Sequence, residues 1–142
     1  YTTMNLAEFL IDVALNTNAT VRTASSKLNL TASQAFHLLS IPFDGISMSS
    51  LAHKLGLDTS TLTRNVQVLV KMGLVDKKPD NYDRRVIRLV LTNEGSKLLK
   101  LLEELLEDKN REVLEKIDLD VQEHLLTLLE KLSWALNCSR SQ

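Results

Sequence analysis

The chain has 142 residues, of which 44% are hydrophobic, and its formal net charge is −1. This length and composition indicate a globular chain with a hydrophobic core, and they exclude the compositions of disordered and collagen-like proteins. The near-neutral total argues against a polyanionic partner only if the charges are evenly spread, so their distribution decides the question.

The charges are in fact distributed unevenly. Residues 51–91 carry eight basic and four acidic side chains, a balance of +4, whereas residues 92–137 carry six basic and eleven acidic side chains, a balance of −5. This asymmetry indicates a basic segment that contacts nucleic acid, followed by acidic helices.

Cysteine content and hydropathy bear on the compartment. Cys138 is the single cysteine, which excludes an intrachain disulfide and fits a reducing environment. No apolar run approaches the roughly 20 residues of a membrane span, and the N-terminus lacks the basic-then-apolar order of a signal peptide. We therefore expect a soluble cytoplasmic protein without a membrane partner.

The first half of the chain is expected to be helical. Apolar residues at helical spacing predict a helix from residue 5 to about residue 14, and the polar run at residues 16–20 leaves open whether it continues to residue 27. Thr31 can cap a short helix over residues 32–41, and Ser47 begins another that Gly56 closes after Leu55.

After a short turn, the next helix is predicted over Thr59 to Met72, with Asp58 as its cap. At about 100° per residue its side chains divide into two faces. One face packs inward, and the opposite face presents hydroxyl, guanidinium, amide and ammonium groups that can reach base edges and phosphates: Leu62, Val66, Leu69, Val70 and Gly73 inward, Ser60, Arg64, Gln67 and Lys71 outward.

The pattern then changes to a period of two. Leu74 and Val75 lead into one strand, and Ile87, Leu89 and Leu91 alternate along a second strand. Turn-forming residues lie between them, so a short hairpin is predicted with Arg84 and Arg85 near its tip. Two guanidiniums there suit a narrow minor groove, although they could merely solubilise an exposed hairpin.

Two long helices complete the chain. Thr92 can cap the first, and Asp120, Val121, Gln122 and Glu123 resemble a capping box that opens the second. Their leucine-rich faces are wider than a one-sided surface helix requires. Excess apolar surface at both ends of a small chain predicts a dimer. Its two reading heads, residues 51–91 of each chain, would then lie about 34 Å apart on a pseudo-palindromic DNA site.

At this point the sequence resembles the MarR family of winged helix-turn-helix transcription regulators. The resemblance rests on SSLAHKLGLDTSTLTRNVQVLVKMGLV, on the wing DKKPDNYDRRVIRLVLTNEG and on the C-terminal helix pair, and it covers roughly Leu6 to Asn137. It implies a mainly α fold with a small β-hairpin wing and a single domain over residues 1–142. Within it, residues 31–91 form the winged helix-turn-helix, and residues 4–28 and 93–137 form the dimerisation helices.

The resemblance also assigns roles to individual residues. It places Ser60, Thr61, Thr63, Arg64 and Gln67 toward the major groove and Arg84 or Arg85 in the minor groove, with Asp83 bracing one of the two arginines. Lys77 is a further candidate for phosphate contact. Val68 stands where many members carry arginine or another polar residue, so it either touches a thymine methyl or is inert.

The family implies control by a small aromatic or phenolic effector, which binds between the dimer helices and the reading head. The candidate pocket residues are Phe9, Phe36, His37 and Phe43. We expect no metal and no cofactor, because the three histidines lie on different predicted helices without cysteine or carboxylate at ligand spacing. Nothing resembles a catalytic motif, so we expect no enzymatic activity.

Two functions remain open from the sequence. The first is a homodimeric DNA-binding transcription regulator, expected to be a repressor. The second is a winged-helix module for protein interaction or dimerisation that does not read DNA. The outward arginines favour the first, because an interaction surface would more often carry apolar residues at these positions.

Overall fold

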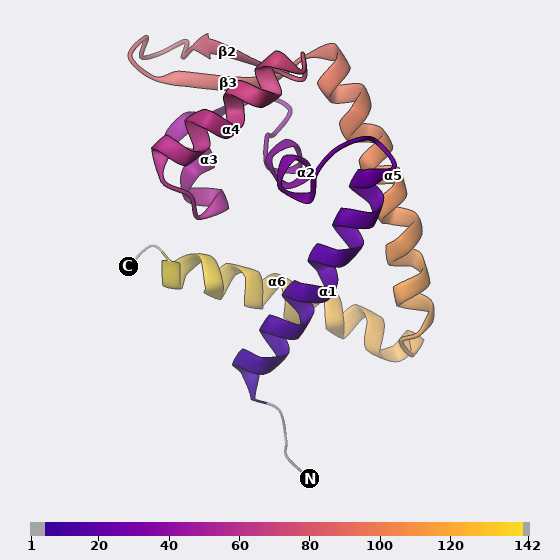
Figure 1. Ribbon diagram of the computed structural model, residues 1–142. Helices are drawn as coiled ribbons and strands as arrows, with labels where there is room; N and C mark the ends of the chain where they lie inside the picture. The colour runs from indigo at the N-terminus through magenta and orange to yellow at the C-terminus, as the bar shows by residue number, and fades with distance from the viewer. Residues whose placement is uncertain (1–4, 141–142) are drawn as a thin grey trace. The chain divides into compact units, whose positions relative to one another are not determined.

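Six helices and a small antiparallel sheet make up the computed structural model, which describes residues 5–140 (Figure 1). The expected fold class is confirmed. The elements are α1 (Leu6–Ser26), α2 (Ala32–Leu39), β1 (Ile46–Ser47), α3 (Met48–Leu55), α4 (Thr59–Lys71), β2 (Val75–Pro79), β3 (Ile87–Leu91), α5 (Asn93–Glu115) and α6 (Leu119–Arg140). They fall into two compact units, Tyr1–Leu106 and Glu107–Gln142.

The first helix extends beyond residue 14, where the sequence left its continuation open. α1 continues without a break through the polar run to Ser26. The polar side chains there bond to the carbonyls of the preceding turn: Asn16 Nδ2 donates to Asp12 O at 2.9 Å and Thr20 Oγ1 to Asn16 O at 3.1 Å. These hydroxyl and amide groups thus find partners within the helix instead of competing with it.

The central helices begin where their caps were predicted. Thr31 and Gln34 form a reciprocal capping box at the start of α2, and Ser47 and Asp58 cap α3 and α4. α2 ends at Leu39, two residues before the expected end, because Ser40 forms its C-cap. In Figure 1, α4 runs beside α3 and leads into the hairpin.

The core of the first unit joins the helices to the sheet. Fully buried side chains from α2, α3, α4 and both long strands pack in one cluster: Leu38, Leu51, Leu62, Val66, Leu69, Val75 and Leu89. A second cluster packs the first half of α5, through Leu102, against Val21, Ala24 and Ala35. The outward face of α4 is therefore held by an apolar core on its opposite side.

The sheet has three strands in the order β1, β3, β2. The hairpin strands pair in antiparallel register from Val75 with Leu91 to Pro79 with Ile87. β1 was not predicted, because its two residues are too short to show alternation. Its pairing of Ile46 with Leu89 is a long-range contact that ties the segment before α3 to the wing.

The second unit is helical and leaves much of its apolar surface exposed. Gln122 Nε2 donates to the carbonyls of Leu114 and Ile117, both at 2.9 Å, and so closes the turn between α5 and α6. The predicted capping box at Asp120 is wrong: α6 already begins at Leu119, and Gln122 closes this turn instead. No helix within residues 5–140 is long and apolar enough to cross a membrane.

Candidate nucleic-acid interface

The two faces of α4 differ as predicted, except that Gly73, which was expected on the inward face, lies beyond the end of the helix and is exposed. Leu62, Val66 and Leu69 are fully buried. On the opposite side Ser60, Arg64 and Gln67 are exposed, and Thr61 and Thr63 are half-buried. Val68 is also exposed, at 47%. The structure thus brings the five predicted groove residues onto one helix that the core holds from behind.

The two threonines of this face already donate their hydroxyl protons. Thr63 Oγ1 donates to Thr59 O at 2.7 Å, and Thr61 Oγ1 donates to Asp58 Oδ2 at 2.9 Å. Asp58 Oδ1 also accepts the Thr61 backbone N–H at 2.7 Å. These bonds, with Arg64 nearby, hold the pKa of Asp58 below its usual range. The threonines keep an acceptor lone pair and a methyl group for a ligand.

The wing tip carries a braced arginine and a free one. Asp83 binds Arg85 through two contacts, Oδ1 to Nε at 3.1 Å and Oδ2 to Nη2 at 3.2 Å. Arg85 lowers the pKa of Asp83 through these bonds. The Arg85 side chain remains 90% exposed. Among residues 5–140, Arg84 has no hydrogen-bond or ion-pair partner and is exposed. The tip therefore presents one oriented and one unrestrained guanidinium.

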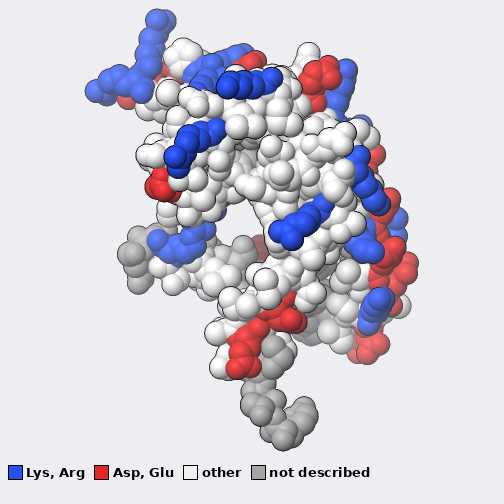
Figure 2. Space-filling view, viewed as in Figure 1, with Lys and Arg blue, Asp and Glu red and all other residues white. Residues whose placement is uncertain are grey.

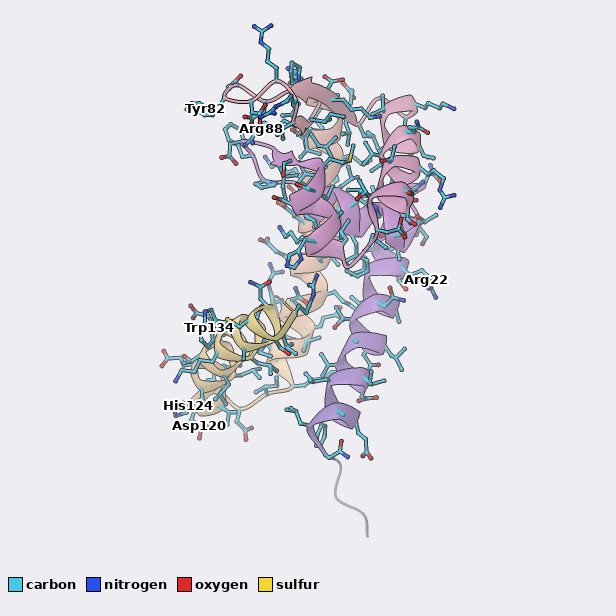
Figure 3. The ribbon with its side chains drawn as sticks, turned by 90° about the vertical axis from the view of Figure 1, so that its left-hand side faces the viewer. Arg22, Tyr82, Arg88, Asp120, His124 and Trp134 are labelled. Carbon is cyan, nitrogen blue, oxygen red and sulfur yellow. The ribbon has the colours of Figure 1, made fainter. Side chains whose placement is uncertain are left out.

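Asp80 organises the turn from which these arginines project. Its Oδ2 accepts the backbone N–H groups of Tyr82, at 3.0 Å, and Asp83, at 3.1 Å. Tyr82 is 98% exposed and lies at the outer end of the wing loop in Figure 3. The backbone of the tip is thus fixed locally, which reduces the entropy lost when it binds a partner.

Arg88 contributes to the basic balance but is used within the protein. Its guanidinium donates to Asp44 O from Nε at 3.1 Å and from Nη2 at 2.9 Å, and Nη1 contacts Asp80 Oδ1 at 3.4 Å. Its side chain is only 30% exposed. Arg88 therefore ties the wing to the loop before β1, a role that sequence reasoning missed because the partners are far apart in the chain.

Other cations surround the wing. Lys77 and Lys78 are both exposed on β2, and Lys71 is exposed at the end of α4. Figure 2 shows Lys and Arg side chains gathered around the wing and the adjoining helix. This surface provides the positive field that phosphate contacts require.

The predicted pocket residues separate into two groups. Phe36 and His37 line a cavity of about 610 Å³ beside α2, together with Arg22 and Lys54, which the sequence did not single out. Phe9 and Phe43 are not among its lining residues, and both are exposed. The cavity combines an aromatic wall with two cationic side chains, which suits a small organic anion.

The described side chains form no metal-binding cluster, and their single cysteine is free. Within residues 5–140, no group of His, Cys, Asp and Glu could hold a metal ion. Cys138 is exposed near the end of α6 and forms no disulfide.

The helix, turn, helix and hairpin of residues 48–91 define a winged-helix DNA-binding protein, in which α4 is the recognition helix. Comparison with known proteins agrees. A family model described as "MarR family" matches residues 30–87. Residues 30–87, which run from the loop before α2 to the first residue of β3, are therefore similar to the MarR family.

Solved structures extend this likeness to nearly the whole chain. Apo MarR from E. coli is 26% identical, with a TM-score of 0.79 over 93% of this chain and 98% of that one. A structure described as the multiple antibiotic resistance repressor MarR is 26% identical, with a TM-score of 0.79 over 92% and 96%. A mutant E. coli MarR complexed with operator DNA is 27% identical, with a TM-score of 0.74 over 89% and 92%.

Proposed function

We propose that this protein is a sequence-specific transcription regulator that binds a pseudo-palindromic operator as a homodimer. The observation that carries the proposal is the outward face of α4, with Arg64 and Gln67 exposed over a fully buried apolar face. Exposed guanidinium and amide groups on a rigid helix are the means by which base edges are read in the major groove. The operator complex of the similar E. coli protein supports this assignment.

The wing supplies the second set of DNA contacts in this proposal. Arg85, oriented by Asp83, enters the minor groove, while Arg84 and Lys77 contact phosphates. An oriented guanidinium loses less entropy on binding than a mobile one, so the braced arginine is the better candidate for the groove. Ser60, Thr61 and Thr63 complete the interface on α4.

Homodimerisation is proposed through the terminal helices, residues 4–28 and 93–137, around the winged helix-turn-helix of residues 31–91. Large apolar side chains exposed on α1 and α6 support it: Leu6, Phe9, Ile11, Val13 and Leu15 on α1, and Leu119, Val121, Leu126, Leu128, Leu129, Trp134 and Leu136 on α6. Apolar surface of this extent marks an interaction site.

Repression and release by an effector form the regulatory part of the proposal. The similar structure described as a repressor supports repression. For the effector, the cavity lined by Phe36 and His37 accepts a small aromatic molecule, and Arg22 and Lys54 favour one with an anionic or phenolic group. The protein is not an enzyme in this proposal, and its cytoplasmic location stays a prediction.

The test is selection of bound sequences from a random duplex library with the full chain. We expect a recovered palindrome that settles symmetry and half-site spacing together. Arg64→Ala should relax the preference at one base position and cost about 1–3 kcal/mol there, whereas Lys77→Ala should weaken all sequences alike and lower the salt slope by about 1.

Two results would contradict the proposal. Equal losses from Arg64→Ala and Lys77→Ala, with base preference unchanged, would remove the reading role of Arg64. No selected motif, together with binding that lacks a steep salt dependence, would favour the interaction module that does not read DNA.

A further inference from the structure

His37 is a buried polar side chain that the proposed DNA contacts do not use. It lies on α2 with 3% of its surface exposed. Within residues 5–140, Ser25 on α1 is the only other polar residue that is buried. A buried imidazole is costly unless its nitrogens have hydrogen-bond partners. The partners of His37 therefore indicate what the residue does.

Both ring nitrogens are engaged, and the first bond determines the second. Nδ1 lies 2.6 Å from the carbonyl oxygen of Ser33. Because a carbonyl can only accept, Nδ1 carries the proton and Nε2 of the neutral ring is left as an acceptor. Asn65 Nδ2 lies 3.1 Å from Nε2 and donates to it. The Ser33 carbonyl thus selects the tautomer that can hold Asn65.

Asn65 belongs to the recognition helix α4, and His37 precedes it by 28 residues. On the helix it lies between Thr61, one turn before, and Val68, one turn after, on the flank that joins the buried face to the outward face. His37, Asn65 and Val68 also line the same small cavity of about 150 Å³. The hydrogen bond between His37 and Asn65 therefore acts on the side of α4 that also carries Thr61 and Val68.

Apart from the bond to Asn65, α4 contacts the core through apolar side chains, which hold it by close packing. Its buried face consists of Leu62, Val66 and Leu69, and apolar contacts are non-directional. A rotation of about 20° would carry a side-chain tip by roughly 2 Å, given a helix radius of about 5–6 Å with side chains. A hydrogen bond tolerates only a few tenths of an ångström. The bond to Asn65 thus adds a directional restraint on the rotation of α4 to the close packing of its apolar face.

We propose that His37 is a positioning residue that sets the rotation of α4 through Asn65, and so determines base preference without touching DNA. The inference rests on the proposed function, because rotation matters only if the outward face reads base edges. Phosphate contacts by lysines and by the wing depend less on this rotation. Loss of the bond should therefore lower discrimination and leave general affinity for DNA in place.

The experiment compares dissociation constants for the selected duplex and a scrambled duplex at one salt concentration. His37→Phe and Asn65→Ala should each lower the ratio of the two constants about tenfold, with scrambled-duplex binding unchanged within about twofold. The double variant should be no worse than either single variant, because the two substitutions break one bond. His37→Gln, whose amide oxygen can accept from Asn65, should restore most of the ratio.

Ser40→Ala is the matched control, since it removes a hydrogen bond within the same region, from Ser40 Oγ to Phe36 O at 2.7 Å, without reaching α4. Its ratio should stay at the wild-type value. Additive losses in the double variant, or parallel losses on both duplexes with a fall in Tm, would overturn the proposal. If His37→Phe fails to fold, Asn65→Ala on the half-buried flank decides alone. Wild-type protein without preference for any duplex would instead contradict the proposed function.

Discussion

Asp58 acts at the scale of a single residue in two ways, because it caps α4 and orients Thr61. Its pKa is lowered from 3.8 by the backbone and hydroxyl bonds of Thr61 and, less, by Arg64. A carboxylate with a lowered folded-state pKa stabilises the fold fully above its unfolded pKa. That stabilisation is lost as the pH falls through the folded-state value. The charge of Asp58 should therefore matter at neutral pH and stop mattering in acid.

Asp58→Asn tests this, because asparagine caps a helix well but carries no charge. We expect Tm at neutral pH to fall slightly in Asp58→Asn and further in Asp58→Ala. Below a pH of about 3.8 the difference between wild type and Asp58→Asn should shrink. Thermal unfolding across this pH range provides the measurement, and a difference that stays constant would show that the charge contributes nothing.

At the scale of residues, the sequence predicted local features but not pairs of residues that are distant in the chain. The division of α4 into two faces and the capping role of Asp58 followed from local spacing, because they depend on neighbours within one or two turns. The bonding partners of His37 and Arg88 could not be predicted in this way. His37 meets Asn65 across 28 residues and Arg88 meets Asp44 across 44, and one sequence carries no signal for such pairs.

At the scale of elements, the joint between the wing and α5 depends on close backbone approach. Thr92 Oγ1 donates to Gly73 O at 2.6 Å and accepts the Gly95 N–H at 2.9 Å, so it links the end of α4 to the first turn of α5. A Cβ on Gly95 would lie 2.0 Å from Leu74 O. The first turn of α5 can therefore pack here only with glycine.

Gly95→Ala should consequently lower the free energy of unfolding by about 1–3 kcal/mol, the usual cost of overpacking. Gly73→Asn is the comparison, because open space surrounds Gly73 and asparagine tolerates its φ of +76°. Urea unfolding should give a smaller loss for Gly73→Asn. An equal loss in both variants would show that the contact with Leu74 costs no more than a side chain at the positive φ of Gly73.

Element boundaries were predicted best where caps decide them. The starts of α2, α3, α4 and α5 followed from Thr31, Ser47, Asp58 and Thr92. Elements that depend on other bonds were harder to predict. The continuation of α1 depends on side chains that bond back to their own helix, and β1 exists only because it pairs with β3.

At the scale of the whole molecule, the proposed assembly is the main determinant of affinity. One reading head with few base contacts binds weakly, and two heads joined by a closed interface add their contacts. Leu128 is 63% exposed on α6, where a partner would cover it. Trp134, 70% exposed and visible on the same helix in Figure 3, offers a large apolar surface for the same purpose.

Leu128→Glu should therefore yield monomers and weaken binding to the selected palindrome by at least about tenfold, since a buried unpaired charge opposes association. Ser50→Glu introduces the same charge at an exposed position of α3, outside the proposed dimer helices, and should remain dimeric. Sedimentation equilibrium gives the oligomeric state. Monomeric wild-type protein, or a dimeric Leu128→Glu variant, would contradict the proposed interface.

The hydroxyl bonds of Thr61 and Thr63 have a chemical consequence for any DNA that α4 contacts. Both protons are already donated inside the protein, so these side chains present methyl groups and single acceptors, and exposed Val68 adds further methyl groups two turns beyond Thr61. The outward face of α4 is thus more apolar than its two threonines would imply. We expect such a surface to distinguish thymine from uracil, two bases that differ by one methyl group and share every hydrogen-bonding atom.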